Sequence, residues 1–232
     1  MNAKVVVVIC LAAIGLYLVT RAGRGERAYQ KALDAYGSGD YERAMVLFDK
    51  AARLLPDDPA VFCDRATVRA NLGDLEGALT DYQRALQNAE AMWGGETDPS
   101  MAHIYYSRGT TYHEGGRLRE AITDYEDAFA ADADYPNARN MLAWCLATAA
   151  DEKLRDPARA LKLALHACEQ SRWRDGYVID TLAAAYAASG DFDNAVKTQQ
   201  KAIVRLPDGE DKTEFQERLE LYESGQPYVS EE

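Results

Sequence analysis

The chain has 232 residues, of which 47% are hydrophobic and 28% are charged, and its formal net charge is −12. Its 16 glycines and 7 prolines are too few for a disordered or collagen-like chain. The acidic surface would repel phosphate backbones, so we expect no nucleic-acid ligand. It would also oppose adsorption to anionic lipid, so a membrane contact requires a dedicated segment.

An uncharged apolar run, Val5–Val19, stands near the amino terminus between Lys4 and Arg21. As a helix it would be about 22 Å long, and the basic residues at its ends could reach opposite headgroup layers. The alternative is a secretory signal, but its only small-x-small cleavage candidate, Thr20-Arg21-Ala22, has arginine at its centre. The run therefore predicts a single-pass membrane anchor over residues 1–24, retained rather than cleaved.

Charge and cysteine content indicate the side of the membrane on which the rest would lie. Three arginines within residues 21–27 outnumber Lys4 and the amino terminus, which favours a cytoplasmic body. Cys63, Cys145 and Cys168 have no CxxC spacing, so they predict small buried hydrophobes, and unpaired thiols agree with a reducing compartment. An extracytoplasmic or secreted body remains the alternative.

From residue 25 onward, a pair of alanines seven residues apart recurs five times. In four of the five copies, a small residue stands twelve positions before the first alanine. A motif that recurs at about 34 residues or slightly more is typical of stacked helical hairpins, because each hairpin needs its neighbours to bury its apolar face. The pairs are Ala44 and Ala51, Ala78 and Ala85, Ala121 and Ala128, Ala160 and Ala167, and Ala195 and Ala202.

Glycine, aspartate and proline mark the ends of the predicted helices. In the first hairpin, Gly39 permits the turn between two helices, and Asp40 can accept the first free amide hydrogens of the second helix. Proline between hairpins stops each unit, because it cannot continue a helix. The same signals recur at Gly73-Asp74, Gly190-Asp191, Pro56, Pro59, Pro136 and Pro207.

Two departures from the regular period are visible. Residues 88–100 lengthen the second unit, and about five residues are inserted around Asp151–Pro157 within the fourth hairpin. After Pro207, Phe215, Leu219 and Tyr222 share one helical face and predict a further helix that covers the end of the array.

These residues resemble the tetratricopeptide repeat (TPR). The resemblance implies an all-α fold: a right-handed α-solenoid of about five helical hairpins plus a C-terminal capping helix, here preceded by a single N-terminal apolar helix. We expect hairpins over residues 25–57, 58–100, 101–136, 137–174 and 175–207, a capping helix over 208–224 and a flexible tail over 225–232. The best matches are Ala66-Gly73-Ala78-Tyr82-Ala85, Gly109-Tyr112-Gly116-Ala121-Tyr125-Ala128 and Ala183-Tyr186-Gly190-Ala195-Ala202-Pro207.

The resemblance also implies a concave groove, lined mainly by the first helix of each hairpin, that binds a protein or peptide. Members that bind chaperones hold a terminal carboxylate there with lysine, arginine and asparagine. The mapped positions of this chain include no basic residue, so a helical or extended apolar segment is the expected ligand. They are Tyr29, Tyr36, Cys63, Thr67, Asn71, Tyr106, Thr110, His113, Asn140, Trp144, Tyr177 and Asp180.

The chain contains no P-loop, HExxH, GxSxG or paired-cysteine motif. His103 and His113 are ten positions apart, not the three or four that would place two ligands on one helical face. We therefore expect no catalytic residue, metal or cofactor, and no enzyme activity. The predicted function is that of a membrane-tethered scaffold or adaptor that binds a protein or peptide in its groove. The alternative is a self-associating structural component of a membrane assembly, which would make the chain a homo-oligomer.

Overall fold

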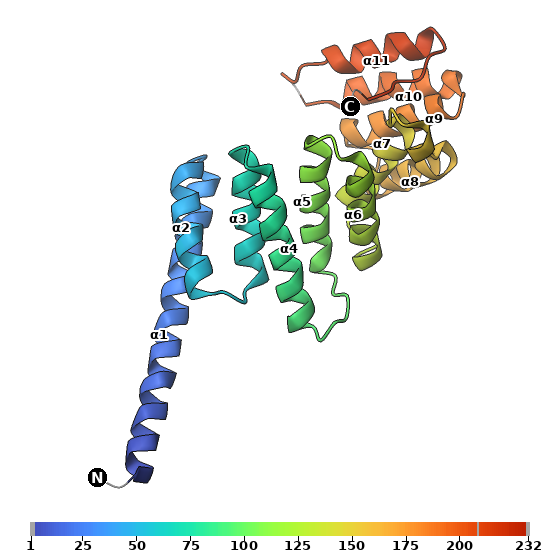
Figure 1. The fold of residues 1–232 in the computed structure, drawn as a ribbon. Coiled ribbons are helices and arrows are strands. Elements are labelled where there is room, and N and C mark those ends of the chain that lie inside the picture. Colours follow the sequence, from blue (N-terminus) through green and yellow to red (C-terminus); the bar gives the residue numbers. More distant parts are fainter. Residues whose placement is uncertain (1–2, 208, 231–232) are drawn as a thin grey trace. The chain divides into compact units, whose positions relative to one another are not determined.

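The computed structural model describes residues 3–207 and 209–230, and side chains from residue 18 onward. Over these ranges the regular structure consists of eleven α-helices and one 3-10 turn, without a strand (Figure 1). The chain divides into two compact units, Met1–Thr97 and Asp98–Glu232. The expectation of an all-α fold built from helical hairpins is confirmed.

The first unit contains two helical hairpins, in which α1 pairs with α2 and α3 with α4 (Figure 1). Gly39 turns the chain between α1 and α2 with φ of +77°, a conformation that glycine adopts at little cost. Asp40 then caps α2, because its carboxylate accepts a hydrogen bond from the Arg43 amide at 3.1 Å. The helices of this unit are α1 (Ala3–Gly37), α2 (Tyr41–Leu54), α3 (Pro59–Asn71) and α4 (Leu75–Met92).

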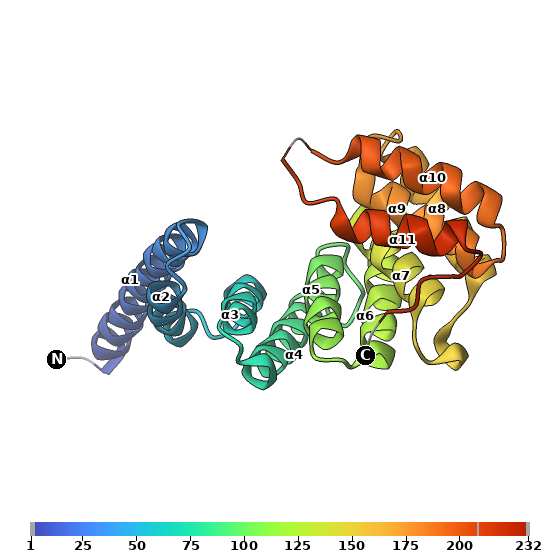
Figure 2. The ribbon, with the colours of Figure 1, turned by 90° about the horizontal axis from the view of Figure 1, so that it is seen from above.

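The second unit contains three hairpins and a final helix that packs on α10 (Figure 2). The predicted insertion in its middle hairpin is confirmed: the 3-10 turn η1 (Glu152–Leu154) lies between α7 and α8. The Asp156 amide donates to the Leu146 carbonyl at 2.9 Å, which returns the inserted residues to the end of α7. The helices are α5 (Met101–Glu114), α6 (Leu118–Ala131), α7 (Pro136–Thr148), α8 (Pro157–Gln170), α9 (Gly176–Ala188), α10 (Phe192–Arg205) and α11 (Thr213–Glu223).

The small residues lie where helices approach one another closely. All ten alanines of the five repeated pairs are buried. At Gly109, a Cβ atom would lie 2.9 Å from a ring carbon of Tyr125, which is closer than such atoms can approach. Phe48, Tyr82 and Tyr125 fill the remaining space and are themselves buried. Close packing at the alanines and glycines therefore accounts for the hairpin contacts.

The predicted membrane anchor is wrong. Over the residues that were described, no helix is both long enough and apolar enough to cross a membrane. The run Val5–Val19 would extend about 22 Å as a helix, short of the roughly 30 Å hydrocarbon core. A separate apolar helix over residues 1–24 is not shown: α1 continues to Gly37, and the side chains before residue 18 lie outside the described part. The assignment to a single-pass membrane protein is withdrawn with it.

Replacing Ala121 with leucine tests the close packing. Ala121 is fully buried in α6, so the larger side chain forces its neighbours apart, and we expect the free energy of unfolding to fall by about 1–3 kcal/mol. The measurement is the urea midpoint by circular dichroism. The matched control is Ala130→Leu at an exposed position of α6, for which a change within about 0.5 kcal/mol is expected. Equal effects of the two substitutions would contradict the packing argument.

Candidate functional site

Helices α7, α9 and α11 of the second unit surround a cavity of about 230 Å³, which we call the α7–α9–α11 site. Four of the predicted groove residues line it, two from α7 and two from α9. The structure thus brings together the groove positions predicted for the fourth and fifth hairpins, and α11 adds three further side chains. The lining residues are Asn140, Met141, Trp144, Tyr177, Asp180, Thr181, Glu214, Phe215 and Arg218.

A buried ion pair joins α9 to α11 beside this cavity. The Arg218 Nε donates to Asp180 Oδ1 at 3.0 Å, and both residues are buried. Gln199 of α10 donates from its side-chain nitrogen to the same carboxylate oxygen at 2.6 Å and to the Phe215 carbonyl at 3.0 Å. Burial raises the pKa of the Asp180 carboxyl above its ordinary value, and the Arg218 guanidinium opposes that shift. The network therefore positions three helices around one charged centre.

Aromatic rings surround the guanidinium of Arg218. Its central carbon lies 4.7 Å from the centre of the Phe215 ring, 5.4 Å from that of Trp144 and 5.5 Å from that of Tyr228. At such distances a cation is attracted by the ring faces. The site thus contains a guanidinium that the mapped groove positions lack, held against an aromatic wall.

The remaining polar lining of the site includes an unsatisfied acceptor. Asn140 Oδ1 is buried and has no hydrogen-bond partner among the described residues. Such an atom is stabilised when a ligand supplies an N–H or O–H donor. Tyr177, which is 50% exposed, packs edge-on against Phe215 with ring centres 5.6 Å apart. An apolar wall with one free acceptor suits a polypeptide segment more than a small ion.

A second cavity of about 500 Å³ adjoins the α7–α9–α11 site and shares Trp144, Glu214 and Arg218 with it. The predicted groove residue His113 lines it from α5, and the carboxyl-terminal residues 228–230 line it as well. Burial lowers the pKa of His113, so this imidazole is neutral at pH 7. Because His113 shares this cavity with Trp144, it lies on the same face of the second unit as the predicted groove positions of α7 and α9.

Tyr106 and Thr110, also predicted for the groove, line neither of these cavities. The half-buried Tyr106 ring packs between Tyr125 and Tyr135, at centre distances of 5.9 and 5.5 Å. Thr110 donates to the Tyr106 carbonyl at 3.1 Å. Within the second unit these two residues join the packing of α5 and α6.

The groove positions predicted for the first unit make contacts within that unit. The Tyr29 hydroxyl donates to Asp64 at 2.6 Å, and burial together with this hydrogen bond raises the tyrosine pKa. The exposed Tyr36 ring packs near Tyr41, with centres 5.7 Å apart. Thr67 donates to the Cys63 carbonyl at 3.2 Å, and the exposed Asn71 donates to the Thr67 carbonyl at 2.8 Å.

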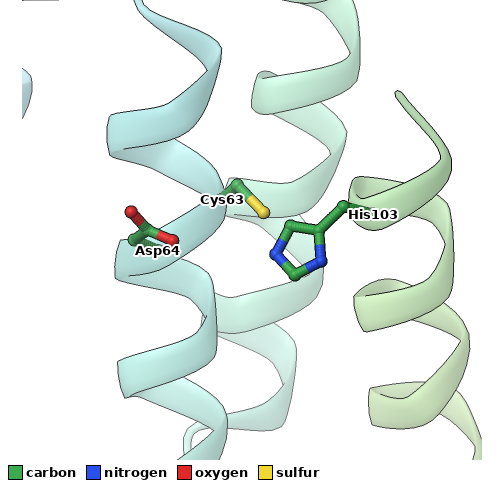
Figure 3. A group of neighbouring side chains, drawn as sticks. All are labelled: Cys63, Asp64 and His103. Carbon is green, nitrogen blue, oxygen red and sulfur yellow. The ribbon is translucent and has the colours of Figure 1, made fainter. Parts of the chain in front are cut away.

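Cys63 and Asp64 are consecutive on α3 and point in different directions (Figure 3). His103, drawn in the same figure, lies on α5 and so belongs to the second unit. Cys63 is buried, as are Cys145 and Cys168, and all three are free thiols. Burial raises the pKa of Cys145 and Cys168 to about 12, so these thiols are protonated and unreactive at pH 7. The prediction of small buried hydrophobes is confirmed.

Sequence reasoning missed Arg218 and Tyr228. Two signals pointed to the arginine: Asp180 is the one charged residue in the sequence of α9, and Arg218 lies three positions after Phe215, on the apolar face of α11. A single buried acid in an apolar helix requires a cationic or hydrogen-bonding partner. Tyr228 follows Pro227 in a short polar segment, and no periodic pattern marks it for packing.

Removing the guanidinium tests the buried network. In Arg218→Ala the Asp180 carboxylate loses its cation, and we expect the free energy of unfolding at pH 7 to fall by about 3–5 kcal/mol. Burial already raises the folded-state pKa of Asp180, and without the guanidinium that pKa rises further. Protonation of the Asp180 carboxyl therefore stabilises the folded variant as the pH falls. The loss should therefore shrink between pH 7 and pH 5, measured by urea unfolding.

The matched control is Arg119→Ala, which removes an exposed ion pair to Asp151 and should cost no more than about 1 kcal/mol. A deficit for Arg218→Ala that equals the control, or that grows on acidification, would contradict the role of this ion pair.

Comparison with known proteins agrees with the repeat architecture. Two family models described as tetratricopeptide repeat match residues 57–134 and 106–172. Tetratricopeptide repeat protein 36 of Bos taurus is 34% identical over 112 residues, which are 48% of this chain and 56% of that protein. Protein FlbA of Caulobacter vibrioides is 33% identical over 92 residues, 40% of this chain and 14% of FlbA. The chain thus spans less than two thirds of either relative.

Among solved structures, PilF of Pseudomonas aeruginosa superposes with a TM-score of 0.66 and 17% identity, covering 88% of this chain and 90% of PilF. At this identity the likeness concerns the fold alone. The two family models together cover residues 57–172, half of the chain, and the helices on either side continue the same hairpin pattern. The chain therefore contains tetratricopeptide repeats.

Proposed function

We propose that this chain is a protein-interaction scaffold that binds a polypeptide segment at the α7–α9–α11 site. TPR proteins bind protein or peptide partners and are typically scaffolds without enzyme activity. The observation that carries the proposal is the cavity itself, in which four groove positions predicted from the sequence meet three residues of α11.

The chemistry of the lining supports a peptide ligand. Trp144, Tyr177 and Phe215 offer ring surfaces on which an apolar or aromatic side chain can pack. The unsatisfied Asn140 Oδ1 can accept a backbone N–H, which every peptide ligand except proline supplies. Apolar contacts would then provide affinity, and the amide would fix the orientation of the segment.

The other groove positions remain predictions. Tyr29, Tyr36, Cys63, Thr67 and Asn71 would bind a partner on the first unit, if the same mode of recognition applies there. Membrane tethering is not part of the proposal, because no described helix can cross a membrane. Self-association, the alternative predicted from the sequence, has no observation in its favour in the described ranges.

Site-specific photocrosslinking tests the proposal. A benzoylphenylalanine in place of Tyr177 at the site is compared with one in place of Val204, a residue of α10 that is 78% exposed. After irradiation in cells, we expect at least five times more protein adduct from position 177 than from position 204.

A second substitution links the adducts to the site. Adding Trp144→Ala to the chain that carries the crosslinker at 177 should reduce the adducts at least fivefold, with unchanged helix content by circular dichroism. Adducts that are equal at the two positions, or that persist without the indole ring, would contradict binding at this site.

A further inference from the structure

After α11 and its C-cap Ser224, residues 225–230 return along the second unit toward α7 (Figure 2). Gly225 has φ of +73° and ends α11, with its amide bonded to the Tyr222 carbonyl at 3.1 Å and the Gln226 amide bonded to the Leu221 carbonyl at 2.9 Å. This pair of hydrogen bonds is the Schellman arrangement that terminates many helices. The segment, expected to be a flexible tail, is instead held by contacts at its far end. We call residues 225–230 the tail segment.

Tyr228 places its ring against the α7–α9–α11 site. Its ring centre lies 5.6 Å from that of Trp144, with the two planes inclined by 40°. The same ring lies 5.5 Å from the Arg218 guanidinium carbon, so the tyrosine contacts both the indole and the cation of the site. Aromatic pairs at this separation contribute beyond the area they bury. The tail thus uses the aromatic wall on which a partner's side chain would pack.

Ser230 completes the attachment at the end of α7. Thr148 is the last residue of that helix, so its carbonyl accepts no hydrogen bond from a later residue of the helix. The Ser230 amide donates to this carbonyl at 2.8 Å. The Ser230 hydroxyl donates to the Thr148 hydroxyl at 2.7 Å, and that hydroxyl in turn donates to the Trp144 carbonyl at 2.9 Å. Two hydrogen bonds therefore fix the backbone and the side chain of one residue.

We propose that the tail segment is a built-in ligand for the wall formed by Trp144 and Arg218, which the α7–α9–α11 site shares with the adjoining cavity. We propose further that the partner is an extended peptide with an aromatic residue followed two positions later by serine or threonine. This inference rests on the function proposed above. Residues two apart in an extended chain lie on the same side, so Tyr228 and Ser230 can both contact α7. Val229 between them is 40% exposed and lines the adjoining cavity without a hydrogen bond or ring contact among those described. A partner of this pattern would reproduce the contacts of Tyr228 with Trp144 and Arg218 and those of Ser230 with Thr148.

Because the tail is joined to α11 by a short link, its effective concentration at the site is on the order of millimolar. A free peptide must therefore compete with it, and weakening the tail should favour the peptide. The full chain Tyr228→Ala removes the ring that contacts Trp144 and Arg218, and Val229→Ala is the matched control at the neighbouring exposed position.

The test is a titration of these two ¹⁵N-labelled full chains with the amidated hexapeptide Gly-Gln-Pro-Tyr-Val-Ser, followed at the Trp144 indole N–H up to about 5 mM peptide. We expect the Tyr228→Ala chain to bind the peptide at least ten times more tightly than the Val229→Ala chain. A hexapeptide with alanine in place of tyrosine should produce no shift of the indole signal. Equal affinities of the two chains would overturn the proposal, as would no binding to a Tyr228→Ala chain whose helix content is unchanged.

The proposed function and this inference fail in different ways. If crosslinking at position 177 depends on Trp144 but the two chains bind the hexapeptide equally, the scaffold role stands and the tail is not its competitor. If the hexapeptide behaves as expected but no adduct forms at position 177, the tail is a ligand of the Trp144–Arg218 wall but no other protein binds at the site, and the scaffold role fails.

Discussion

Close approach of helices at buried alanines and glycines is the constraint on which the structure depends. Where Gly109 meets Tyr125, no space remains for even one additional carbon atom. Such contacts allow the two helices of a hairpin, and neighbouring hairpins within a unit, to share one apolar interior. The first helices of successive hairpins then lie side by side, which is why α7 and α9 line one cavity of the second unit and α5 and α7 line the adjoining one.

The buried ion pair adds specificity to this apolar packing. Hydrophobic contacts alone would let α11 rotate or slide on α9 and α10 at small cost, whereas Arg218 must meet both Asp180 and the ring faces around it. The position of α11 therefore determines the shape of the α7–α9–α11 site. It also determines where the chain leaves Gly225, and so where Tyr228 and Ser230 contact α7.

The sequence predicted the hairpins well because their signals are local and repeated. Alanine pairs, turn glycines and capping aspartates such as Asp40 each act within one hairpin, so their spacing alone reveals them. The contribution of α11 was less visible, because Asp180 and Arg218 are 38 positions apart and the pairing depends on how two helices pack. The docking of the tail left no periodic signal at all. The apolar run near the amino terminus led to the wrong prediction of a membrane span, because a span requires sufficient length as well as hydrophobicity.

The most direct test of the tail docking is whether Tyr228 contacts Trp144 in solution. Nuclear Overhauser effects between the Tyr228 ring protons and the Trp144 indole protons of the full chain would report this contact without any substitution. We expect clear cross-peaks, together with slow hydrogen exchange of the Ser230 amide that bonds to Thr148. Absent cross-peaks, with nanosecond motion of residues 226–230 like that of an unfolded peptide, would contradict the tail docking.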